Sequence, residues 1–286
     1  MVKIAHIADT HIRNLKYHDD YRQVFAQLYN KLKEQEPDYI VHCGDIAHTK
    51  TQLSPEFFEL TREFLTGLAD IAPTYIILGN HDGNLKNSNR QDAISPIVDA
   101  MDHANLHLLK NSGETDIGNN IVLNVLSVFD RENWVRPTNS SKINIALYHG
   151  AISGCSTGSG WTMTHGEDSI GIFSEFDFAM LGDIHKPQAL DMKKRIRYAG
   201  STIQQNFGEG PRKGYLLWTI EGRWKWKADQ IYLQHPRPFL SISLNKDGSF
   251  PDHLHIPQGA RLRLICNYNL SIDKLRKACD IAKIKW

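Results

Sequence analysis

Short apolar runs recur along the first 181 residues, and each leads directly into a loop that carries aspartate, histidine or asparagine. Such a run, bounded by turn residues, is typical of a buried β-strand. The runs cover residues 3–8, 39–43, 75–78, 143–148 and 176–181. Open α/β sheets bind ligands beyond the carboxyl ends of their strands. The pattern therefore predicts five strands whose loops converge on one polar site.

Apolar residues at helical spacing fill the segments between the first runs. One face consists of Tyr21, Val24, Phe25, Leu28, Tyr29 and Leu32. Ser54-Pro55-Glu56 predicts a helix start, because the hydroxyl can cap and proline fits the first turn. A third helix is expected over residues 90–103, with Pro96 in its first turn or at a kink. The strand-helix-strand order implies parallel strands joined by right-handed crossovers.

Beyond residue 105 the pattern changes to shorter strands and turns. This change predicts an α/β fold that passes into mostly β structure, with two sheets face to face and helices outside. His235-Pro236-Arg237-Pro238 is a linker signal, so we expect a main domain over residues 1–234 and a small segment over 235–286. Strands over 239–244 and 262–267 and a helix over 271–284 make a poor core alone. The segment therefore either leans on the main domain or belongs to something longer.

Composition narrows the class of protein. The chain has 286 residues, 41% hydrophobic and 23% charged, with a net charge of +1, so any nucleic-acid site must be a local patch. Cys43, Cys155, Cys266 and Cys279 form no CxxC pair, which argues against a cysteine zinc site and indicates a reduced, intracellular protein. No apolar run approaches the roughly 20 residues of a membrane helix, and no leader pattern opens the chain. We expect a cytoplasmic protein without a membrane partner.

The loops after the five runs carry ligands of one chemical kind. Their motifs are Asp9-x-His11, Gly44-Asp45-x-x-His48, Gly79-Asn80-His81-Asp82, His149, and Gly182-Asp183-x-His185. Carboxylate, imidazole and amide groups suit Mn, Fe or Zn. Two ions about 3.5–4 Å apart can share one carboxylate and clamp a phosphoryl group. A histidine that is not a ligand can then protonate the leaving oxygen.

In order and spacing these motifs resemble the calcineurin-like metallophosphoesterase superfamily. Within it the chain is most similar to the SbcD-type DNA repair nucleases of cells and phages. His48 stands where ordinary phosphatases usually carry a second acid, and Phe207-Gly208-Glu209 resembles a stretch that follows the last metal ligands in these nucleases. The resemblance covers residues 1–220. It implies a four-layer αββα sandwich followed by a small α+β cap, of which residues 235–286 are all or part.

The resemblance also implies roles for the loop residues. The metal ligands would be Asp9, His11 and His185 on the first ion, Asp45 between both ions, and Asn80 and His149 on the second. His81 would be the general acid, oriented by Asp82, and His48 would contact the scissile phosphate. Asp183 stands where the family usually has histidine. Its carboxylate would join the second metal and favour harder ions such as Mn or Mg.

The function implied is that of a DNA exonuclease and endonuclease with two Mn ions, or Mg in their place. Such enzymes form homodimers and work with an SbcC-type ATPase in double-strand break processing, recombination and replication, here in a host cytoplasm if the chain is phage-encoded. The DNA backbone would meet cations beside the metal loops: Arg13, Lys16, Lys86, Arg90 and Lys186. Two alternatives stay open. One is a stand-alone metallophosphatase for small phosphoesters or phosphoproteins, and the other is a scaffold without metal.

Overall fold

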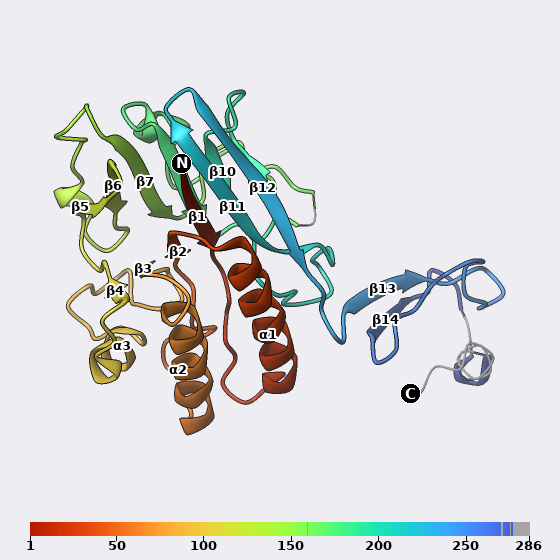
Figure 1. Cartoon of the computed structure of the whole chain (residues 1–286). Coiled ribbons are helices and arrows are strands. Elements are labelled where there is room, and N and C mark those ends of the chain that lie inside the picture. Colours follow the sequence, from red (N-terminus) through yellow and green to blue (C-terminus); the bar gives the residue numbers. More distant parts are fainter. Residues whose placement is uncertain (159, 270, 275, 277–286) are drawn as a thin grey trace.

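The computed structural model describes residues 1–158, 160–269, 271–274 and 276. Two six-stranded sheets lie face to face (Figure 1). The first has the order β12-β11-β1-β2-β3-β4. Its strands are β1 (Val2–Ile7), β2 (Tyr39–Cys43), β3 (Thr74–Ile77), β4 (Leu106–Leu108), β11 (Lys213–Gly222) and β12 (Lys225–Leu233). The second has the order β5-β6-β7-β8-β10-β9. Its strands are β5 (Gly113–Gly118), β6 (Ile121–Leu126), β7 (Ile143–His149), β8 (Phe178–Gly182), β9 (Gln188–Ala189) and β10 (Ile196–Tyr198).

The central strands are buried on both faces. On β1, Ile4 packs between the sheets, whereas Ala5 and Ile7 face the helices. Successive side chains of a strand point to opposite faces, so a strand covered on both sides reads as one continuous apolar run. His6, in the same strand, is fully buried, and its Nε2 lies 3.1 Å from the carbonyl oxygen of Leu181 on the second sheet. It is thus a core histidine.

Three helices cover the outer face of the first sheet: α1 (His18–Gln35), α2 (Pro55–Ala69) and α3 (Ser95–Met101). Figure 1 shows α1 and α2 side by side and α3 next to α2. The predicted start of α2 is confirmed, since the Ser54 hydroxyl accepts the backbone N–H of Phe57 at 3.2 Å. No helix in the described part of the chain is long and apolar enough to cross a membrane.

The third helix is shorter than the 90–103 expected. The Asp92 carboxylate accepts the N–H groups of Ile94 and Ser95, which fixes the helix start just before Pro96. Asp102 then adopts a left-handed φ of 44° and ends the helix. Local side-chain hydrogen bonds therefore override the helical periodicity on either side.

The predicted α/β fold with two packed sheets is confirmed. On the outer face of the second sheet, the described residues form loops with two 3₁₀-helices, η1 (Arg131–Asn133) and η2 (Ile170–Phe173), in place of α-helices. Residues 151–176 contain five glycines, and each costs a helix about 1 kcal/mol. This layer is therefore built from loops whose apolar side chains, such as Ile152 and Phe173, pack on the sheet.

The C-terminal segment contributes a third, two-stranded parallel sheet of β13 (Phe239–Ser243) and β14 (Arg261–Ile265). It leans on the main domain, because Arg237 and Arg261 both bind the fully buried carboxylate of Asp20 in the first turn of α1. The Gln204 side chain adds hydrogen bonds to the backbone N–H and carbonyl of Phe239, both at 2.9 Å. The boundary at residue 234 stays a prediction. Most of the helix expected over 271–284 lies outside the described residues.

Candidate metal centre

The carboxyl ends of five strands meet at one edge of the sandwich. β1, β2 and β3 run parallel in the first sheet, and β7 and β8 run parallel in the second. The predicted metal ligands lie in the loops after these strands, except His149, which is the last residue of β7. Since parallel strands end at the same edge, their loops converge as the sequence pattern predicts.

The approach of these loops is so close that glycine is required at two positions. A Cβ atom on Gly79 would lie 2.2 Å from Oδ1 of Asp45. A Cβ atom on Gly182 would lie 2.0 Å from the carbonyl oxygen of Cys43. The two glycines of the Gly-Asn-His-Asp and Gly-Asp-Ile-His motifs therefore let the first and second sheets bring their ligands together.

Backbone strain is concentrated in the same loops. Four ligand candidates have left-handed φ angles: 51° at Asp9, 48° at His11, 57° at Asp45 and 95° at Asp183. Non-glycine residues in unfavourable backbone regions cost on the order of 1–3 kcal/mol each and cluster at functional sites. Hydrogen bonds from the backbone N–H of His11 to the carbonyl of Asp45 (2.9 Å) and from that of Asp183 to Oδ1 of Asp9 (2.9 Å) hold these turns in place.

The side chains form a cluster with Asp45 at its centre. Oδ2 of Asp45 lies 3.4 Å from Nε2 of His11 and 3.4 Å from Nε2 of His149. Three groups have donor atoms within 4.8 Å of one another: Asp9, His11 and His185; Asp9, Asp45 and His149; and His11, Asp45 and His81. The first group is the set that the resemblance implies for the first ion, whereas the second group joins Asp45 and His149, implied for the second ion, to Asp9, implied for the first. The Asp45 carboxylate therefore lies where it could bind the ions of both ligand sets.

The imidazole rings of His149 and His185 are each oriented by a hydrogen bond at Nδ1. The Nδ1–H of His149 donates to the carbonyl of Cys43 at 2.7 Å, and the Nδ1–H of His185 donates to Oε1 of Glu209 at 2.7 Å. Each ring therefore presents Nε2 to the cluster, where Nε2 of His185 lies 2.9 Å from Nε2 of His11. Such partners are typical of histidines that bind metals, because they fix the tautomer and the ring orientation.

Several acceptors in the cluster have no hydrogen-bond partner among the described residues. They include Oδ2 of Asp9, Oδ1 of Asn80 and Nε2 of His149, all buried. Buried acceptors without a partner are costly and uncommon, so a group of them in one cluster calls for a ligand. A pair of divalent cations fits this donor set of carboxylate, amide and imidazole groups.

Charge in the cluster points to the same conclusion. Burial raises the pKa of the Asp9 carboxyl to about 6 and also raises the pKa of Asp183. Burial alone would lower the pKa of His149, but the nearby carboxylates, Asp45 first, raise it above its usual range. Because a bound cation needs ionised carboxylates and neutral imidazoles, metal binding here must displace protons and weaken as the pH falls.

Asp82 does not do what the resemblance implied. We expected it to orient His81, but its carboxylate accepts the backbone N–H groups of Asp45, Ala47 and Gly79 at 2.8–2.9 Å. His81 is instead oriented by its Nδ1–H, which donates to the carbonyl of His48 at 2.7 Å. Asp82 thus ties the β2 and β3 loops together, and Nε2 of the exposed His81 ring has no hydrogen-bond partner among the residues that the structure describes.

His48 lies beside His81, and Asp183 lies beside Asn80 and His149. The ring of His48 is parallel to that of His81 within 24°, with centroids 6.1 Å apart. Oδ1 of Asp183 accepts the Asn80 side-chain amide at 3.2 Å and lies 3.8 Å from Nε2 of His149. Asp183 therefore lies beside the ligands of the second metal, as expected, although none of the three close groups includes it. Its role as a ligand stays a prediction.

The five cations expected to meet DNA fall into two sets. Arg13 lies two residues after the ligand candidate His11, and its half-buried guanidinium donates to the carbonyl of Gln205 at 3.1 Å. After burial, its charge helps to lower the pKa of His48 to about 4. Lys186 is exposed and directly follows the ligand candidate His185. Lys16, Lys86 and Arg90 are exposed on outer loops, and within the described part of the chain their side chains make no ion pair. The structure thus brings Arg13 and Lys186 to the site.

Two neighbours of the cluster carried no predicted role. Glu209 binds His185 and is 8% exposed, and Lys50 donates to the carbonyl of Asn80 at 2.9 Å. The resemblance of the Phe207-Gly208-Glu209 stretch to a nuclease motif drew attention to Glu209, but it did not indicate the contact between Glu209 and His185. For Lys50, a cation in a polar loop, the sequence offers no signal.

Comparisons with known proteins identify the family to which the chain belongs. A family model described as calcineurin-like phosphoesterase matches residues 2–187, which include every predicted metal ligand. Uncharacterized protein R555 of Acanthamoeba polyphaga mimivirus is 40% identical over 302 residues, which cover 98% of this chain and 22% of that protein. The chain thus spans about a fifth of the length of this relative. The crystal structure of Pseudomonas putida nuclease MPE aligns with a TM-score of 0.29 and 16% identity, over 51% of this chain and 61% of that chain.

Proposed function

Because the chain belongs to the calcineurin-like phosphoesterase family, whose members hydrolyse phosphoesters at a site for two metal ions, we propose that it is a metal-dependent DNA nuclease. The observation that carries this proposal is the pairing of the exposed His81 ring with the half-buried His48 ring, whose centroids lie 6.1 Å apart beside the cluster. Ordinary phosphatases of the family usually carry a second acid at this position, so the imidazole of His48 supports a nuclease, and both imidazoles can donate to a phosphate oxygen. The proposed substrate is the phosphodiester backbone.

The residues of the site have separate roles in hydrolysis. Asp9, His11, His185, Asn80, His149 and Asp45 would hold the two cations, with Asp183 beside the second. When bound, such cations polarise the phosphoryl group and activate the attacking water. His81 protonates the leaving sugar oxygen from Nε2, because its Nδ1 is already committed to the carbonyl of His48. His48 and Arg13 contact oxygens of the phosphate from the open side.

We extend the proposal to the setting in which the nuclease acts. The resemblance to SbcD-type nucleases supports Mn as the native ion and an SbcC-type ATPase as the partner in double-strand break processing. It also supports a homodimer formed through the outer faces of α2 and α3, where Phe58 is 41% exposed. For a chain similar to a viral protein, the place of action would be the host cytoplasm.

One assay tests the proposal against its alternatives. Labelled single-stranded and duplex DNA are incubated with the protein and Mn, Mg or EDTA, next to p-nitrophenyl phosphate as the monoester. We expect Mn-dependent DNA cleavage that EDTA and Asp45→Ala both abolish. Fast monoester hydrolysis without DNA cleavage would identify a phosphatase, and no hydrolysis of either substrate by the metal-loaded protein would favour the scaffold.

A further inference from the structure

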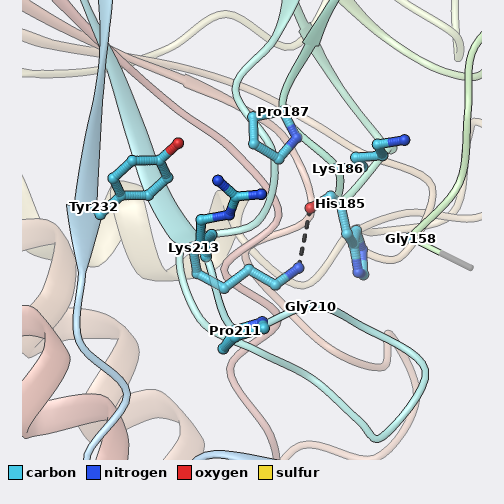
Figure 2. A pocket seen from close by; sticks show the side chains of 9 residues that line it. Gly158, His185, Lys186, Pro187, Gly210, Pro211, Lys213 and Tyr232 are labelled. Atoms are coloured by element: carbon cyan, nitrogen blue, oxygen red, sulfur yellow. Dashed lines mark hydrogen bonds between the residues drawn. The ribbon is translucent and has the colours of Figure 1, made fainter.

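A pocket of about 380 Å³ lies directly beside the metal cluster and shares His185 with it. Gly210, Pro211, Arg212 and Lys213 form one part of its wall, and Lys186 and Pro187 form another. Figure 2 shows Tyr232 at one end and His185 with Gly158 at the other, with Lys213 between them. Its volume falls in the range of small-molecule sites. The pocket therefore offers one further binding position next to the metal cluster.

Two cations of the pocket are free to bind a ligand. Lys213 is not one of them, since its Nζ lies 2.7 Å from Glu209 and donates to the carbonyl of His185 at 3.0 Å (Figure 2). Lys186 and Arg212 are exposed, and neither side chain makes a hydrogen bond or ion pair with any residue that the structure describes. Two uncompensated positive charges beside a phosphoester site favour a second phosphate group.

The ring of Tyr232 provides a flat apolar surface in the same pocket as the cations Lys186 and Arg212. Its side chain is 48% exposed, although it lies on β12 within a continuous strand pairing. Its backbone partner is Gly214, where a Cβ atom would lie 1.9 Å from the carbonyl oxygen of Ile231. β11 and β12 are therefore closely packed at this point, and the backbone that carries the Tyr232 ring is held rigidly. An exposed aromatic ring beside free cations is the arrangement on which nucleic-acid bases stack.

We propose that this pocket holds the nucleotide next to the scissile phosphate, with its phosphate at Lys186 and Arg212 and its base on Tyr232. The inference rests on the proposed function and specifies its substrate. A base can reach Tyr232 only when it is unpaired, so the pocket selects single-stranded or frayed ends. Stacking accepts any base, so cleavage should show little sequence preference.

The test compares two phosphodiesters that differ in length. A single-stranded oligonucleotide can fill both the cluster and the pocket, whereas bis(p-nitrophenyl) phosphate has no second phosphate or nucleobase. Loss of one stacked base costs on the order of 5- to 140-fold. We therefore expect Tyr232→Ala to lower kcat/KM for the oligonucleotide about tenfold more than for the small diester, and Tyr232→Phe to retain most of it. Arg212→Ala should reduce the slope of log binding against log salt by about 1.

Trp224→Ala is the matched control, because Trp224 is an exposed aromatic residue at the turn of the same hairpin. Eight residues separate it from Tyr232, or about 26 Å along the strand. Oligonucleotide binding, followed by fluorescence anisotropy in EDTA, measures the pocket without catalysis. Equal losses on both diesters, or unchanged oligonucleotide binding in Tyr232→Ala and Arg212→Ala, would overturn the inference. A wild-type protein that binds the oligonucleotide through Tyr232 but never cleaves it would contradict the proposed function alone.

Discussion

Replacing Glu209 by glutamine tests whether a residue outside the metal cluster positions one of its ligands. The carboxylate of Glu209 accepts the Nδ1–H of His185 at 2.7 Å, and its second oxygen lies 2.7 Å from Nζ of Lys213. Burial would raise the pKa of Glu209, but the hydrogen bond from His185 and the charge of Lys213 lower it to about 2. Glu209 is therefore ionised at neutral pH, and glutamine removes a charge that both partners use.

The size of the effect follows from these contacts. Partners that orient metal-binding histidines typically contribute about 10- to 100-fold to metal affinity, or about 1.4–2.8 kcal/mol. Breaking a buried ion pair costs about 3–5 kcal/mol of folding free energy. Lys213, which is 5% exposed, keeps its hydrogen bond to the carbonyl of His185, so we expect the lower end of that range.

Two measurements separate these effects. Isothermal titration with Mn gives the dissociation constants for wild type and Glu209→Gln, and denaturant unfolding in EDTA gives the free energy of unfolding without metal. Glu221→Gln is the control, because Glu221 pairs with Lys225 on the surface, where such pairs contribute about 0–1 kcal/mol. A folded Glu209→Gln protein whose Mn dissociation constants stay within about twofold of wild type would refute the positioning role.

Substitutions at three further positions test single residues. His81→Asn should keep the metals and lower kcat about 10²- to 10⁴-fold, whereas loss of metal occupancy would show that His81 is a ligand, as its closeness to Asp45 allows. Asp183→His should shift metal preference toward softer ions such as Zn; an unchanged profile, with full activity in Asp183→Ala, would remove Asp183 from the site. Burial would raise the pKa of Asp92, but Lys110 and Ser95 lower it below 3.8, so its contribution to stability is present above that pH and lost below it. Asp92→Asn should flatten the acid limb of the curve of unfolding free energy against pH, and parallel curves would contradict this.

The sequence predicted the strand ends and the cluster well because both depend on local patterns. A buried apolar strand is visible as a run, and a ligand such as Asp9 or Asn80 directly follows it. Parallel strands then place these residues at one edge without further information. The five converging loops therefore required no knowledge of tertiary contacts.

The features that were missed depend on contacts between distant segments or on turn geometry. Glu209 meets His185 only when the loop before β11 folds against the loop after β8, and no periodicity records that contact. Asp82 follows His81 in sequence. Its backbone N–H, however, donates to the carbonyl of Gly79, and its carboxylate accepts a hydrogen bond from the loop of Asp45. Adjacency in sequence therefore suggested the wrong partner.

We propose that the strand-end loops hold two metal ions. The direct measurement is the number of Mn ions per chain, from elemental analysis of the loaded and desalted protein, with their positions from anomalous diffraction of its crystals. We predict two ions per chain, one among Asp9, His11 and His185 and one beside Asn80 and His149, with Asp45 reaching both. One ion or none in these loops would contradict the account.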